Sequence, residues 1–149
     1  MKLSTKGRYG LRALVDLAWF GKGGHLALCQ IAERQGISEN YLEQVFSTLR
    51  KAGLVKSVKG AQGGYTLALK PEDIRVGIVL RTLEGDLLIS DRDGSDGEPD
   101  PSSIQASLQT IVWDKVNEAI LKVVDGLTLA DLVEEYRSRT GEDSLMFFI

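Results

Sequence analysis

Residues 28–53 read LCQIAERQGISENYLEQVFSTLRKAG, and this stretch decides the fold. Apolar residues recur in it at helical spacing: Leu28, Ile31 and Ala32, then Tyr41/Leu42, Val45/Phe46 and Leu49. Gly36 is expected to end the first helix, Ser38 to cap the second, and Gly53 to end it. Two helices joined by a short turn that contains glycine predict a helix-turn-helix.

The residues that follow predict a β-hairpin. Residues 54–59 (LVKSVK) and 65–69 (YTLAL) alternate apolar and polar side chains, and residues 60–64 (GAQGG) form a glycine-rich turn between them. A hairpin directly after the second helix of a helix-turn-helix is typical of a winged helix. We therefore expect a mainly α fold with a small β-hairpin.

Further helices are predicted on both sides of this unit. One starts at Ser4 or Thr5 and ends near Gly21, a second covers 76–83, and the last runs from 129 to about 139. A longer one covers 104–124 and would be roughly 30 Å long. A domain of this size is too small to cover such a helix fully. We therefore expect the matching helix of a second copy of the chain to pack against it. Residues 86–103, acidic and rich in Gly and Pro, are expected to form a mobile loop.

Charge is unevenly distributed along the chain. Residues 1–70 hold eleven Lys/Arg against four Asp/Glu, whereas residues 71–149 hold seven against seventeen, which gives the net charge of −3. A basic half suggests an anionic partner, most commonly nucleic acid. The alternative is two surfaces of opposite sign without a binding role.

Four segments resemble the Rrf2 family of bacterial transcription regulators. They are 2–10 (KLSTKGRYG), 37–44 (ISENYLEQ), 49–55 (LRKAGLV) and 60–65 (GAQGGY). The resemblance spans essentially the whole chain and is densest over 1–85. It implies a winged helix-turn-helix with a long dimerisation helix, acting as a homodimeric repressor on palindromic double-stranded DNA.

The resemblance and the charge pattern together divide the chain into three parts. Residues 1–85 are expected to be the DNA-binding domain and 86–103 the acidic loop. Residues 104–149 are expected to supply the dimerisation helix, a short C-terminal helix and an apolar tail.

Candidate DNA contacts follow from the expected docking of the second helix in the major groove. Its polar face offers Asn40, Glu43 and Gln44 for reading bases, with a solvated helix surface as the alternative. Phosphate contacts are expected from Lys2, Lys6, Arg8, Tyr41, Arg50, Lys51, Lys56 and Lys59. Packing is as good a role for Tyr41. The wing tip with Gly60, Gly63 and Gly64 is small enough to approach a minor groove, although positive φ angles would equally explain Gly63 and Gly64.

The inventory of reactive residues argues against an enzyme and against a cofactor. One His and one Cys, with no phosphate-binding loop, do not assemble a catalytic site. Iron–sulfur members of the family carry three clustered cysteines, and residues 86–103 have none, so we expect no cluster. Cys29 is expected to be a small buried residue of the second helix. A winged helix that binds only proteins is the remaining alternative.

The last five residues are apolar and follow Glu142 and Asp143. The chain resembles a cysteine-poor branch of the family that represses cysteine metabolism and works with cysteine synthase. This implies that Phe148 and Ile149 insert into that enzyme, while the alternative is a tail packed on its own dimer. No stretch is long and apolar enough for a membrane helix and none resembles a signal peptide, so a cytoplasmic protein is expected.

Overall fold

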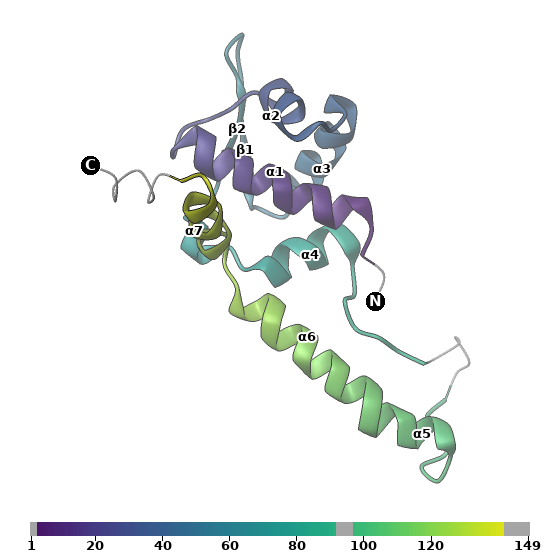
Figure 1. Cartoon of the computed structure of the whole chain (residues 1–149). Helices are drawn as coiled ribbons and strands as arrows, with labels where there is room; N and C mark the ends of the chain where they lie inside the picture. Colours follow the sequence, from purple (N-terminus) through teal and green to yellow (C-terminus); the bar gives the residue numbers. More distant parts are fainter. Residues whose placement is uncertain (1–2, 92–96, 142–149) are drawn as a thin grey trace.

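The computed structural model of the chain describes residues 3–91 and 97–141. Helices and a two-stranded sheet form a compact body from which one long helix projects as an arm (Figure 1). The elements are α1 (Thr5–Gly21), α2 (Leu28–Gln35), α3 (Glu39–Lys51), β1 (Val55–Val58), β2 (Gly64–Leu67), η1 (Pro71–Asp73), α4 (Val76–Glu84), α5 (Ile104–Leu108), η2 (Gln109–Trp113), α6 (Asp114–Gly126) and α7 (Leu129–Arg139). No helix among the described residues is both long and apolar enough to cross a membrane.

The predicted helix-turn-helix is confirmed. Gly36 adopts a left-handed conformation (φ 64°) after α2, and Ile37 is buried in the turn. The Ser38 hydroxyl accepts a hydrogen bond from the Tyr41 N–H and caps α3. The inward face of α3 is fully buried, with Phe46 0% exposed at its centre.

The predicted hairpin is also confirmed. β1 pairs antiparallel with β2, in a register that sets Val55 opposite Leu67 and Val58 opposite Gly64. A bridge between Leu26 and Tyr65 fixes the hairpin to the chain just before α2. The wing is therefore held to the helix-turn-helix through its second strand.

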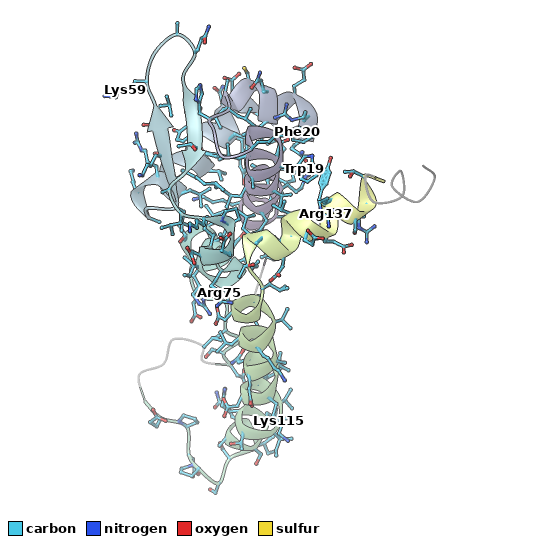
Figure 2. The ribbon with its side chains drawn as sticks, turned by 90° about the vertical axis from the view of Figure 1, so that its left-hand side faces the viewer. Trp19, Phe20, Lys59, Arg75, Lys115 and Arg137 are labelled. Atoms are coloured by element: carbon cyan, nitrogen blue, oxygen red, sulfur yellow. The ribbon has the colours of Figure 1, made fainter. Side chains whose placement is uncertain are left out.

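The last helix returns to the body rather than continuing the arm. Leu129 at the start of α7 is 1% exposed within the main core, and its N–H donates to the Ile74 carbonyl oxygen at 2.8 Å. Near the other end of α7, Tyr136 stacks on Trp19 of α1 with ring centroids 5.6 Å apart. Figure 2 shows Trp19 and Phe20 facing α7. Both ends of α7 are thus tied to the body.

The arm is one continuous helical rod made of α5, η2 and α6. η2 is a single stretch of π-helix in its middle, which the sequence pattern did not predict. One side of α6, with Ile120 and Val124, packs against α4. Large apolar side chains elsewhere along the arm are exposed: Ile104 (80%), Leu108 (42%), Ile111 (61%), Val116 (36%) and Val123 (59%).

The expectation for Cys29 was wrong. The inward face of α2 is made by Leu28 and Ile31, and the cysteine is exposed. The residue next to Leu28 lies about 100° further around the helix and therefore points outward.

Candidate nucleic-acid interface

The residues predicted to read bases share the exposed surface of α3. Asn40, Glu43 and Gln44 are all exposed and lie in the first half of the helix, while Leu42, Val45 and Phe46 are buried beneath them. Amide side chains can bond adenine bidentately, and a carboxylate can accept from cytosine N4. The N-terminal half of α3 thus presents hydrogen-bonding side chains at the surface of the molecule.

The N-terminus of α1 lies beside the start of α3. The Thr5 and Tyr41 hydroxyls are 3.1 Å apart, and the rings of Tyr9 and Tyr41 meet edge to face with centroids at 5.9 Å. Tyr41 is half-buried, so it packs between the helices and its hydroxyl is already bonded. Lys6 and Arg8 are carried on this first turn of α1, with Arg8 exposed.

The remaining predicted phosphate contacts lie at two other places. Arg50 and Lys51 are exposed at the C-terminal end of α3, about 15 Å along the helix from Asn40. Lys56 is exposed on β1, and Lys59 lies on the side of the projecting hairpin (Figure 2). Lys2 lies outside the described residues.

Glycines shape the wing for two different reasons. Gly60 has a φ of 116°, a conformation that favours glycine. Gly63 and Gly64 do not have positive φ. A Cβ on Gly63 would lie 2.2 Å from the Val58 carbonyl oxygen, and one on Gly64 would lie 2.0 Å from that of Leu26. Close backbone approach, rather than left-handed geometry, therefore requires glycine at these two positions.

A buried acidic residue that the sequence analysis did not single out supports the helix-turn-helix. Asp16 of α1 is 2% exposed and accepts hydrogen bonds from Arg34 Nε (2.9 Å), Arg34 Nη2 (2.7 Å) and Gln35 Nε2 (2.9 Å) of α2. The hydrogen bond to Asp16 raises the pKa of Arg34 against the opposing effect of burial. A polar residue at a core-facing position of α1 was the available signal.

Glu84 is a second residue whose structural role the sequence did not predict, and it fixes the start of α1. Oε1 of Glu84, at the end of α4, accepts from the Ser4 hydroxyl (2.7 Å), the Ser4 N–H (3.1 Å) and the Gly7 N–H (2.6 Å). Burial would raise the pKa of Glu84, but these hydrogen bonds outweigh burial and hold the pKa below its ordinary value. Its partners lie some eighty residues away in the sequence, so no local pattern marks them.

The wing is also tied at its tip. His25 Nε2 lies 2.7 Å from the carbonyl oxygen of Gln62, so the ring nitrogen is the donor. This contact and the Leu26–Tyr65 bridge hold the turn of the hairpin close to the start of α2. The tail residues Phe148 and Ile149 lie outside the described residues.

Comparisons with a family model, with curated sequences and with solved structures all point to the same protein family. The Rrf2 model, described as an iron-dependent transcriptional regulator, matches residues 3–135. The curated regulator CymR of Bacillus subtilis is 37% identical over the full length of both chains, and IscR of Aliivibrio salmonicida is 41% identical over 89% of this chain and 77% of its own. The solved structure of CymR, described as the global cysteine regulator of B. subtilis, superposes with a TM-score of 0.75 at 40% identity. That match covers 91% of this chain and 98% of the other.

The iron in the family description does not fit the donors of this chain. Iron–sulfur clusters are held by several Cys thiolates. The single cysteine of the sequence, Cys29, is exposed on α2, and residues 86–103 contain none. A cluster held by three cysteines is thus incompatible with the sequence. By its winged helix, by the match over most of its length and by relatives named as regulators rather than enzymes, the chain belongs to the Rrf2 family of transcriptional regulators.

Proposed function

We propose that this regulator is a homodimeric repressor that binds a palindromic operator. The observation that carries the proposal is the exposed row Asn40, Glu43 and Gln44 on α3, flanked by the basic first turn of α1 and the basic hairpin. Residues 1–85 would bind the DNA. Residues 86–103 and 104–149 would be the acidic connection and the dimerising part.

The arm supports the dimer. Ile104, Ile111 and Val123 are each more than half exposed, which is costly for a helix facing only water. A second copy of the same helix would bury this stripe and place two α3 helices about one turn of DNA, ~34 Å, apart.

The test is selection of genomic fragments by the purified chain, followed by sequencing and a salt titration of the recovered site. We expect an inverted repeat, and a log–log salt dependence whose slope is set by the number of phosphates contacted. A monomeric chain with no preference over bulk competitor DNA would refute the proposal.

The two kinds of contact predict different mutant behaviour. Gln44→Ala should weaken operator binding by about 1–3 kcal/mol and relax the preference at one base pair, since it removes a base contact. Lys59→Ala should weaken binding to the operator and to bulk DNA by the same factor, and it should lower the slope of the salt dependence by about one. Both are read from fluorescence anisotropy with operator and scrambled duplexes. Equal losses on the two duplexes for Gln44→Ala would remove it from the base-reading set.

Cysteine and sulfur metabolism is the proposed target. Support comes from the full-length similarity to a protein named as a cysteine regulator. Iron-dependent regulation, suggested by the description of the family model, is the second candidate, and the single cysteine disfavours a cluster that would sense iron. The genes next to the selected fragments decide between the two.

A partner enzyme is part of the same proposal. The apolar C-terminal tail would insert Phe148 and Ile149 into the active-site entrance of a cysteine synthase. A chain without its last four residues should then lose co-elution with the synthase while remaining dimeric. A truncated chain that still co-elutes would refute this docking.

A further inference from the structure

Glu84 stands at the junction between the body and the connection to the arm. It is the last residue of α4, and Gly85 turns the chain away with a φ of 83°. Its carboxylate crosses to the first turn of α1 and accepts from Ser4 and Gly7. The end of one helix is thereby fixed to the start of another.

The first turns of α1 and the end of α4 are in close contact. A Cβ on Gly7 would lie 2.6 Å from Glu84 Oε1, and a Cβ on Gly10 would lie 2.2 Å from Leu83 Cδ1. Two glycines, one turn apart, therefore let α1 rest directly on the end of α4. The Ser4 hydroxyl donates to Glu84 and accepts from the Lys6 N–H, so it serves the carboxylate and the helix cap together.

The fixed turn is also the one that faces the proposed DNA. It carries Lys6 and Arg8, and Thr5 on the same turn touches the Tyr41 hydroxyl of α3. A shift of this turn would move Lys6 and Arg8 and, at the same time, the Thr5 contact that supports the start of α3.

We infer that Glu84 is a positioning residue for DNA binding, which orients the first turn of α1 and the start of α3 without touching DNA itself. This inference rests on the proposed function. It predicts an effect opposite to simple electrostatics, because removing a negative charge from a DNA-binding domain would otherwise strengthen binding.

The test measures operator affinity, salt slope and melting temperature for Glu84→Ala, Glu84→Gln and Glu84→Asp. We expect Glu84→Ala to weaken binding about tenfold, because a shifted turn loses phosphate contacts, while the dimer persists. Glu84→Gln keeps an acceptor oxygen at the same reach and should restore most of the affinity. Glu84→Asp keeps the charge but has a shorter side chain, so this variant should bind the operator more weakly than Glu84→Gln. It replaces the alanine variant in the test if Glu84→Ala does not fold.

Asp125→Ala is the matched control. Asp125 is also a carboxylate bonded to α4, through Arg81 (2.8 and 2.7 Å), but it lies on α6. The Asp125→Ala substitution removes one negative charge, as Glu84→Ala does, and also breaks a hydrogen-bonded contact to another helix. We expect its operator affinity to lie within twofold of the wild type.

A double-mutant cycle isolates the contact. Gly7→Ala alone should weaken binding, because its methyl group displaces Glu84. Combined with Glu84→Ala it should cost little, since the clash is gone and alanine favours a helix over glycine. The Gly7 amide signal in ¹⁵N spectra should also shift as Glu84 is protonated, a readout that needs no DNA.

Two outcomes overturn the inference while leaving the proposed function intact. One is wild-type or tighter operator binding by a folded Glu84→Ala dimer, and the other is the same Gly7→Ala penalty in both backgrounds. A wild-type chain that selects no DNA would instead refute the proposed function and this role with it.

Discussion

At the scale of single residues, the least expected feature is a charged side chain in the core. The carboxylate of Asp16 is fully buried, and its partner Arg34 is 31% exposed. The Arg34 guanidinium also lies over the Phe20 ring, 4.2 Å from its centroid. One acid therefore orients α2 against α1, and the Phe20 ring packs on the guanidinium of its partner.

Asp16→Asn is expected to destabilise the fold without creating a cavity. Half of a buried ion pair is then left uncompensated, which costs several kcal/mol when both groups are enclosed. Arg34 can rehydrate in part, so we expect about 2 kcal/mol. The check is the urea midpoint of unfolding.

The control for Asp16 is Glu134→Ala, which breaks the exposed pair with Arg137 on α7. It should leave the midpoint almost unchanged, because exposed pairs contribute little. If the two variants unfolded at the same midpoint, Asp16 would have no special structural role.

At the scale of elements, the π-helical turn η2 explains the spacing of the arm's apolar residues. Ile104, Leu108 and Ile111 follow a helical spacing, but the next exposed apolar residue is Val116, five positions on. In a regular α-helix that step would rotate Val116 away from the stripe. A π-turn takes up one extra residue, and η2 spans 109–113, so it brings Val116 and Val123 back to the same side.

This geometry predicts that the arm tolerates a deletion where it should not tolerate an insertion. Removing Lys115 would let the rod close as a regular α-helix with the apolar stripe still aligned, so the proposed dimer should persist. Inserting one alanine after Lys115 should turn the two halves by about 100° and weaken dimerisation at least tenfold. Sedimentation equilibrium measures both. Equal dimer constants would mean that the exposed stripe is not the interface.

The sequence predicted the elements that are marked by local signals and did not predict the contacts between distant residues. The boundaries of α3 and of the hairpin were predictable because Ser38, Gly53 and the alternation of 54–59 are local signals. The roles of Asp16 and Glu84 were not, because their partners lie 18 and 80 residues away. The π-turn was hidden too, since a five-residue step reads as a gap in a helical pattern unless the backbone is known. For the wing glycines, the structure distinguishes a close approach from a positive φ, which composition cannot.

At the scale of the whole molecule, polar contacts join the arm to the body at several points. Arg81 and Asp125 join α4 to α6 through two hydrogen bonds. The Asn117 side chain pairs with both backbone groups of Ile89, at 2.7 and 2.9 Å, and holds the segment after Gly85 on α6. The Glu84 contact with Ser4 and Gly7 is separate from these and fixes α4 to the start of α1. The arm contacts therefore set the position of the arm, and the Glu84 contact sets the position of the DNA-facing turn.

Two of these contacts make the stability of the molecule depend on pH. Hydrogen bonds from Arg81 hold the pKa of Asp125 below its ordinary value, and those from Ser4 and Gly7 do so for Glu84 against the effect of burial. The unfolded chain therefore takes up protons at a higher pH than the folded chain. The stabilisation is fully present above the ordinary carboxyl pKa values of about 4 and is lost as the pH falls through the lower folded values.

The expected result is a falling urea midpoint between about pH 5 and pH 3, with a slope that depends on these two residues. A chain carrying Glu84→Gln and Asp125→Asn should start from a lower midpoint at neutral pH and decline less steeply. Glu118→Gln, at an exposed carboxylate of α6 with no ion pair among the described residues, is the control and should keep the wild-type slope. Because the slope measures proton uptake on unfolding, a double variant as steep as the wild type would assign the acid sensitivity to other carboxylates.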